Sequence, residues 1–153
     1  MDMLALGDIS AISAYPCNQL TRNEQITHFT VWAFMASPLQ LSCNLDHMDD
    51  FTMSLVTNED LLQINQDELG AGAVLEAEDG SAKVYTRLLA NGDFAAAFIN
   101  AEDEPCRLAL NRPGARIQIY DVLAGKELGT MADEVAFTIP VHGTRVVRCR
   151  IKP

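Results

Sequence analysis

The aspartates and glutamates are the residues of this sequence best suited to catalysis, but only one of them stands at a position typical of a functional residue. Asp2 lies in the short apolar segment Met1–Leu4, which is followed by the Gly7-Asp8 turn. α/β proteins place working groups at the carboxyl edge of a sheet in such a position. From spacing alone, a solvated chain terminus is the favoured interpretation. Asp49-Asp50 and Glu59-Asp60 are explained as charges at helix N-termini, which the helix dipole favours.

The histidines and serines that could carry chemistry form no cluster. No histidine has a second ligand at metal-binding spacing, so each is interpreted as an isolated residue of a loop, helix or turn. No serine has a nearby histidine and aspartate that would make it a nucleophile. The residues weighed are His28, His47, His142, Ser13 and Ser42. Residue types alone therefore predict no catalytic residue, no metal and no cofactor.

The four cysteines differ in their surroundings. Cys43 and Cys149 lie in apolar runs typical of strands, where a free thiol behaves as a small hydrophobe. Cys17 and Cys106 have more polar neighbours, and the sequence leaves open whether they pair. Because no two cysteines form a CxxC motif, a zinc knuckle is not expected.

The charge of the chain is unevenly placed. Its 153 residues are 48% apolar, enough for a packed core, and carry a formal charge of −10. Residues 1–70 hold ten acidic side chains and one basic one, Arg22, whereas residues 71–153 hold eleven acidic and ten basic. An acidic surface repels phosphates, so nucleic acid and anionic membranes are not expected partners. No signal peptide or membrane-spanning run is recognised, and the compartment stays open.

The first 70 residues are typical of α/β structure. Thr21 and Glu24 form a capping-box pattern, and the helix that starts there is expected to end at Ser37-Pro38. The apolar run Leu39–Leu45 then predicts a strand buried on both faces, as in a parallel sheet. Two short helices are expected next, over 51–56 and 58–65, the second with a cap pattern at Thr57 and Asp60.

From Gly72 the hydrophobic period changes from helical to two. The dipeptides Asp79-Gly80 and Asn91-Gly92 predict hairpins with type I′ turns. Seven short strands are expected, and they favour an antiparallel β-sandwich or barrel. The strands are Val74–Ala77, Ala82–Leu89, Asp93–Ile99, Arg107–Leu110, Arg116–Leu123, Glu134–Ile139 and Thr144–Ile151. In the last strand Val147, Cys149 and Ile151 are expected to point inward and the alternating cations to form a solvated face.

Several motifs together resemble a known family. Asp2-Met3-Leu4, the run THFTVWAFMASPLQLSCNL and the segment DDFTMSLVTNEDLLQINQDELG are similar to the C-terminal half of the α-galactosidases of glycoside hydrolase family 27, the melibiase group. GKELG and PVHGTRVV are similar to that family's last strands. Met1, Asn44 and Glu68 depart from the family pattern. Met1 stands where the family has a proline, so it is interpreted as an imposed start.

The resemblance implies a fold and an activity. The fold class is α/β followed by all-β: residues 1–70 would be an incomplete (β/α)8 barrel segment, strands seven and eight with their helices, and residues 71–153 a C-terminal antiparallel β-sandwich. The activity would be that of a retaining hydrolase of terminal α-galactosides, whose two catalytic aspartates follow barrel strands four and six. Neither aspartate is expected in this chain. Asp2 and Met3 would instead line the sugar pocket, Asp2 as a hydrogen-bond acceptor or support and Met3 by packing.

Two further readings stay open at this point. As a piece of such a hydrolase, the chain would be inactive alone. Its uncovered barrel edges would make it unstable, self-associating or dependent on the missing barrel half. A non-catalytic β-sandwich that binds a partner or a carbohydrate is the alternative. One half of a split glycosidase is the third possibility. The sequence does not determine the preferred sugar or the oligomeric state.

Overall fold

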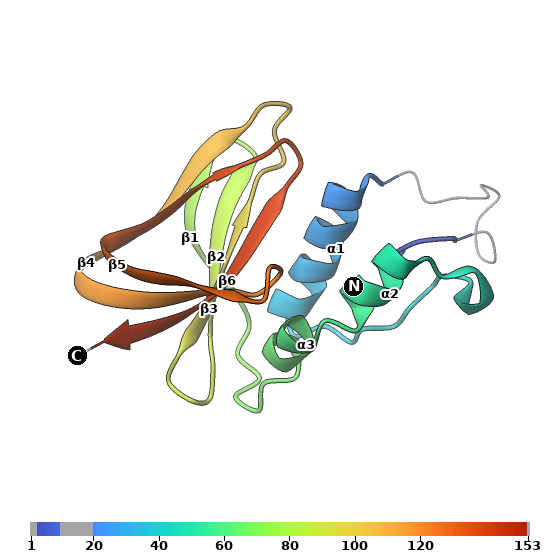
Figure 1. Cartoon of the computed structure of the whole chain (residues 1–153), viewed down its shortest axis with the longest axis horizontal. Coiled ribbons are helices and arrows are strands. Elements are labelled where there is room, and N and C mark those ends of the chain that lie inside the picture. The colour runs from blue at the N-terminus through green and yellow to red at the C-terminus, as the bar shows by residue number, and fades with distance from the viewer. Residues whose placement is uncertain (1–2, 10–19, 153) are drawn as a thin grey trace.

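The computed structural model describes residues 3–9 and 20–152, in which a helical layer lies against a body of strands (Figure 1). Helices precede strands, in agreement with the predicted change of period after Gly72. The helices are α1 (Arg22–Phe34), the 3-10 helix η1 (Leu45–His47), α2 (Asp50–Val56) and α3 (Glu59–Asn65). The strands are β1 (Val74–Asp79), β2 (Ala82–Leu88), β3 (Phe94–Ile99), β4 (Cys106–Asp121), β5 (Lys126–Ile139) and β6 (Thr144–Lys152). None of the helices in the described part is long and apolar enough to cross a membrane.

α1 begins where the sequence predicts, because Thr21 and Glu24 form the capping box. The Thr21 hydroxyl accepts a hydrogen bond from the Glu24 amide at 3.3 Å, and the Glu24 carboxylate accepts one from the Thr21 amide at 2.7 Å. The helix ends at Phe34, and Ala36 has a positive φ of 52°. Pro38 follows, which cannot continue a helix.

α2 and α3 are short helices, each capped by one polar side chain. Asp49 caps α2 and Asn58 caps α3, each accepting from the backbone amide three residues later, at 2.7 and 2.9 Å. The predicted cap at Thr57 is therefore wrong. Thr57 is the C-cap of α2, so α3 starts one residue later than the sequence pattern indicates.

The apolar run 39–45 is not the buried strand that the sequence predicts. Within the described residues its only ladder contact is a single parallel bridge from Leu41 to Leu4. Leu45 is 66% exposed, whereas Leu39 and Leu41 are partly buried. A parallel strand is buried on both faces only where neighbouring strands and helices cover it. The described residues provide one such neighbour, the segment around Leu4.

The six strands form one antiparallel sheet in the order β1-β2-β3-β6-β4-β5. The prediction of seven strands is wrong at one place, because the expected strands Arg107–Leu110 and Arg116–Leu123 are parts of the continuous β4. The expected break at Pro113-Gly114 is instead a shift in the register between β4 and β5. Such an irregularity bends a strand without ending it.

Because β4 and β5 are long and bent, the sheet folds over itself as a β-sandwich does (Figure 1). Contacts join strands that are not neighbours in the sheet, such as β2 with β4 and β3 with β5. The folded sheet encloses the sandwich core, which includes Val84, Phe98, Leu110, Ile117 and Val135. The architecture fits the antiparallel β-sandwich that the sequence predicts.

Both predicted hairpins are present, but their turns are not of type I′. A type I′ turn needs positive φ at both central residues. At Asp79-Gly80 and Asn91-Gly92 only the glycines have it, 59° and 84°. Between β2 and β3 the Gly92 amide donates to the Leu89 carbonyl at 3.0 Å. This is the pattern of a type I turn followed by a left-handed glycine, which suits a three-residue hairpin loop.

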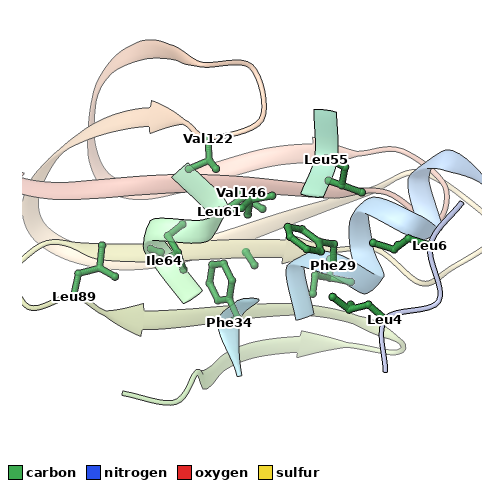
Figure 2. Packing of buried hydrophobic residues seen from close by; sticks show 13 residues of the cluster. Leu4, Leu6, Phe29, Phe34, Leu55, Leu61, Ile64, Leu89, Val122 and Val146 are labelled. Carbon is green, nitrogen blue, oxygen red and sulfur yellow. The ribbon is translucent and has the colours of Figure 1, made fainter. Parts of the chain in front are cut away.

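β3 is buried along its whole length and separates two cores. One set of its side chains faces the sandwich core, and the alternate set faces the helices. The first set is Phe94, Ala96 and Phe98, and the second is Ala95, Ala97 and Ile99. The second face belongs to the helix-side core, in which Figure 2 shows Phe29 and Phe34 of α1 with Leu61 and Ile64 of α3. The helices thus cover the face of the sheet that the bent strands leave open.

Arg87 of β2 joins the sheet to the C-terminal ends of two helices. Its guanidinium donates to the carbonyl of Ala33 in α1 at 2.6 Å and to that of Asn65, the last residue of α3, at 3.2 Å. The residue is 1% exposed, and this burial lowers the pKa of Arg87, while the Asp67 carboxylate opposes the shift. A cation is favourable where helix carbonyls lack intrahelical donors.

The alternating cations of β6 form the predicted solvated face only in part, because Arg150 and Lys152 are exposed whereas Arg148 is half-buried. The three arginines of the strand are not free. They pair with carboxylates, at N–O distances of 2.5, 3.4 and 2.9 Å for Arg145–Asp121, Arg148–Asp60 and Arg150–Asp93. Because Asp60 belongs to α3, the Arg148 pair is a second link between helices and sheet. Ile151, expected to point inward, is 57% exposed because it lies near the open end of the folded sheet.

The variant Arg87→Met is expected to lower the free energy of unfolding by about 2–4 kcal/mol, because two buried helix carbonyls lose their donor. Urea denaturation followed by circular dichroism measures this loss. Arg87→Lys is expected to restore less than half of it, since an ammonium group lacks the planar fork that reaches both carbonyls.

Arg107→Met is the matched control, because Arg107 also lies on a strand and pairs with a carboxylate, Glu134, but its side chain is 61% exposed. Its free energy of unfolding is expected to change by no more than about 0.5 kcal/mol. Equal losses in the Arg87 and Arg107 variants would contradict the assigned role of Arg87.

Candidate functional site

The two residues predicted to contact substrate lie at the start of the chain. Asp2 is outside the described residues. Met3 is described and is 48% exposed, although it precedes the fully buried Leu4. The candidate site therefore consists of Met3 and of the residues that fix the position of the segment 3–9.

The segment 3–9 runs parallel to the segment that follows α1. The Leu4 amide donates to the Gln40 carbonyl at 2.8 Å, and the Ser42 amide donates to the Leu4 carbonyl at 3.0 Å. Further on, the Asn44 amide donates to the Asp8 carbonyl at 2.7 Å. Two apolar segments separated by α1 thus lie side by side with their carboxyl ends together, as in one unit of an α/β layer.

Two polar side chains of α1 hold the segment 3–9 from the other side. Gln25 accepts a hydrogen bond from the Gly7 amide at 2.9 Å, and its own amide donates to the Leu20 carbonyl at 3.1 Å. His28 Nε2 lies 3.3 Å from the Ala5 amide and accepts from it. Burial lowers the pKa of His28, which keeps this acceptor nitrogen unprotonated. Both side chains therefore help to position Met3.

Apolar packing completes the support. Leu4 and Leu6 have no exposed surface and insert into the helix-side core beside Phe29 (Figure 2). Gly7 has a positive φ of 59°, and a Cβ atom there would lie 2.8 Å from the Thr52 hydroxyl oxygen. The chain can turn at this point only because the residue is glycine.

The carboxyl ends of the two segments carry a small polar group, Asp8, Asn44 and His47. The His47 Nδ1 atom lies 3.3 Å from Asp8 Oδ2 and 3.3 Å from the side-chain Nδ2 of Asn44. His47 is exposed, so the group can offer donors and acceptors to a hydroxylated ligand. Asp8 was not among the predicted site residues. The signal for it was its position directly after an apolar segment, where α/β proteins place functional groups.

The described part of the chain holds no group of three His, Cys, Asp or Glu residues that could bind a metal. Four carboxyl groups of the described residues have a lowered pKa, chiefly because the charged form accepts hydrogen bonds. The groups and their main donors are Glu24 with Thr21, Asp49 with Thr52, Glu76 with Thr86 and Asp93 with Arg150. Each of these carboxyl groups is ionised at neutral pH and suits a hydrogen-bonding or structural role.

The serines and cysteines considered as candidate catalytic residues form no catalytic group with Asp8, Asn44 and His47 in the described part of the chain. Ser42 is buried next to the parallel bridge, and Ser13 lies outside the described residues. Cys43, Cys106 and Cys149 are free thiols, and burial raises the pKa of Cys149 to about 12. Cys17 also lies outside the described residues. A thiol with such a raised pKa is unreactive at neutral pH.

Two family models match consecutive parts of the chain. A model described as alpha galactosidase A matches residues 2–67, and one described as the alpha galactosidase C-terminal beta sandwich domain matches residues 79–149. Among curated relatives, α-galactosidase A of Cellvibrio japonicus is 36% identical over 104 residues, which are 68% of this chain and 23% of that relative.

Solved structures agree in fold. A β-L-arabinopyranosidase of family GH27 from Geobacillus stearothermophilus superposes with a TM-score of 0.85 at 26% identity, over 99% of this chain and 36% of that one. α-Galactosidase I of Mortierella vinacea superposes with a TM-score of 0.87 at 22% identity, over 97% and 38%, and this second likeness concerns the fold alone. The chain spans between 23% and 38% of the length of these proteins.

The variant Gly7→Ala is expected to lower the free energy of unfolding by about 2–4 kcal/mol, because it combines an unfavourable positive φ with a contact to Thr52. Gly70→Ala is the matched control: Gly70 has a φ of 60°, but no atom lies within 4 Å of the position of a Cβ. Its cost is expected to be about 1 kcal/mol. Urea denaturation measures both, and equal costs would show that the space beside Thr52 is not limiting.

His28 is expected to make the protein less stable as the pH falls. Because the folded-state pKa of His28 is lowered, the unfolded chain binds more protons below its ordinary pKa of about 6.5. The contribution is complete above that pH and is lost as the pH falls through the folded-state value. The free energy of unfolding of the wild type minus that of His28→Gln should decrease between pH 7.5 and pH 5.5.

Proposed function

The chain belongs to the α-galactosidase, or melibiase, family, and we propose that it forms the C-terminal portion of a retaining glycoside hydrolase acting on terminal α-galactosides. In this proposal residues 1–70 are the last two strand–helix units of a (β/α)8 barrel, and residues 71–153 are its C-terminal β-sandwich. The complete enzyme binds and cleaves the sugar, and this chain contributes one side of the pocket.

The observation that carries the proposal is the parallel bridge between Leu4 and Leu41 on either side of α1. A strand, a helix and a parallel neighbouring strand make up the repeating unit of a (β/α)8 barrel. Active sites of such barrels lie at the carboxyl ends of the strands. The group of Asp8, Asn44 and His47 lies at these carboxyl ends, and Met3 lies at the start of the segment 3–9, next to the bridge.

Asp2 and Met3 are proposed to contact the sugar without taking part in bond cleavage. Met3 has an apolar, half-exposed side chain on a backbone that Gln25 and His28 fix in place. It is suited to pack against the apolar face of a pyranose ring. Asp2 is proposed to accept hydrogen bonds from sugar hydroxyls or from neighbouring groups of the pocket.

The two catalytic carboxyl groups are proposed to come from outside residues 1–153. A retaining glycosidase needs a nucleophile and, about 5 Å away, a proton donor whose pKa is raised. Glu24, Asp49, Glu76 and Asp93 have lowered pKa values, which suits none of them to be the proton donor. We therefore expect the isolated chain to be inactive. A separate chain that carries barrel strands one to six would make the protein half of a split glycosidase.

The preferred sugar is proposed to be galactose in α-linkage, because the family models and the curated relative bear that activity in their names. The β-L-arabinopyranosidase among the solved structures indicates the nearest alternative. A β-L-arabinopyranose ring has the configuration of α-D-galactopyranose without its hydroxymethyl group. The residues that face this group would therefore distinguish the two substrates.

A carbohydrate-binding module based on stacking is the second candidate, and the aromatic residues of the sheet do not favour it. A stacking surface needs a row of exposed rings. Phe94 and Phe98 are buried in the sandwich core, where Phe137 also packs, and Tyr85 and Tyr120 pack against the helix-side core. None of these five rings forms an exposed row.

The isolated chain is expected to release no p-nitrophenol from p-nitrophenyl α-D-galactopyranoside above a buffer blank. When the chain is fused to the C-terminal end of barrel strands one to six of a relative, the fusion protein is expected to be an active enzyme with measurable kcat/KM. In that enzyme Met3→Ala should lower kcat/KM by about tenfold, the cost of about 1.4 kcal/mol of lost contact in the transition state.

Met53→Ala is the matched control for this measurement, because Met53 is 49% exposed but lies on α2. Its kcat/KM should stay within about twofold of the unmodified enzyme. Turnover by the isolated chain, or an equal loss in the Met3 and Met53 variants, would refute the proposed division of roles.

A further inference from the structure

A polar pocket lies between α3 and the helix-facing side of the sheet, away from the edge that carries Met3. Its volume is about 200 Å³. α3 contributes Asp60, and the sheet contributes Gln118 and Tyr120 of β4, Glu127 of β5 and Arg148 of β6, with Asp93 and Arg150 at one side. The proposed hydrolase function uses none of these residues.

The side chains of this pocket are held in place by one another. Arg150 Nε and Nη2 donate to the two oxygens of Asp93 at 3.0 and 2.9 Å. The Tyr120 hydroxyl donates to Asp60 Oδ2 at 3.0 Å, and Arg148 Nη2 lies 3.4 Å from Asp60 Oδ1. The pocket is therefore pre-organised, which reduces the entropy that a ligand must offset on binding.

The balance of charge disfavours an ionic ligand. Two guanidinium groups repel a cation, and three carboxylates repel an anion such as phosphate. Because Asp60 and Asp93 already neutralise the two arginines, neither charge is available to bind a counter-ion. A neutral polar ligand meets no net repulsion from these groups.

Hydrogen-bonding capacity remains after these pairs are made. Within the described residues, Gln118 and Glu127 have no side-chain hydrogen bond, and the buried Arg148 Nε atom has no acceptor. The lining of the pocket thus includes an amide and a carboxylate that can bind a ligand, while the unpaired guanidinium N–H lies buried behind them. Adjacent hydroxyl groups of a sugar, each both donor and acceptor, match such a mixed set.

We propose that this pocket is an accessory binding site for a neutral saccharide, formed by α3 and the sheet and separate from the edge that carries Met3. It would hold one sugar unit by hydrogen bonds between the sugar hydroxyls and the side chains of Gln118 and Glu127, with the carboxylate of Glu127 as an acceptor. The proposal is independent of the proposed hydrolase activity, since it depends only on the charges and free hydrogen-bonding groups of the pocket.

Titration of the ¹⁵N-labelled full chain with methyl α-D-galactopyranoside, sucrose and inorganic phosphate tests the proposal by NMR. A neutral sugar should give saturable shifts at the amides of residues 118–120, 127 and 148–150. Gln118→Ala and Glu127→Ala should each weaken that binding about tenfold while the rest of the spectrum shows a folded protein. Glu134→Ala, an exposed carboxylate of the same strand β5, should leave the affinity unchanged.

Three outcomes would overturn the accessory site. One is the absence of saturable shifts up to about 100 mM sugar, a concentration at which even millimolar affinities are saturated. Another is saturable binding of phosphate with no binding of the sugars. The third is a response confined to residues 3–8 and 41–47, because this would place the sugar at the Met3 edge and would support the proposed hydrolase function instead.

Discussion

β3 has to be buried on both faces, because apolar side chains alternate to both sides along Phe94–Ile99. One face is covered by the sheet itself, where the long bent strands β4 and β5 fold back over it. The other face is covered by α1 and α3. Ala95 and Ala97 are small, which lets α1 lie close to the sheet. The helical part of the chain is therefore a required layer of the β-sandwich.

The same layer determines where the candidate site lies. Arg87 ties the ends of α1 and α3 to β2, and Arg148 ties α3 to β6. α1 in turn holds the segment 3–9 through Gln25 and His28. The position of Met3 thus depends on the sheet, although no strand of the sheet reaches the edge where Met3 lies. This arrangement gives the β-sandwich a mechanical role in a protein whose chemistry is proposed to take place in a barrel.

The two parts of the chain differ in how fully they satisfy their own hydrogen bonds. The sheet pairs six strands in one continuous ladder. In the described residues before Gly72, the strand-like contacts come down to one parallel bridge, and Met3 and Leu45 close to it are 48% and 66% exposed. A parallel pair with few neighbours has little independent stability. Relatives extend well beyond the length that this chain matches, and under the proposed function further barrel strands would supply the neighbours of this pair.

Local features could be predicted from the sequence alone, because the interacting residues are three or four apart. The capping box of Thr21 and Glu24, the places of the hairpins and the inward alternation of Val147 and Cys149 are of this kind. For the candidate site, a resemblance indicated Asp2 and Met3, whose contact with substrate stays a prediction. Asp8 and His47 meet across 39 residues. Only the tertiary structure decided the continuity of β4, the exposure of Leu45 and the burial of Arg87. Each of these depends on partners far away in the chain, which no local pattern encodes.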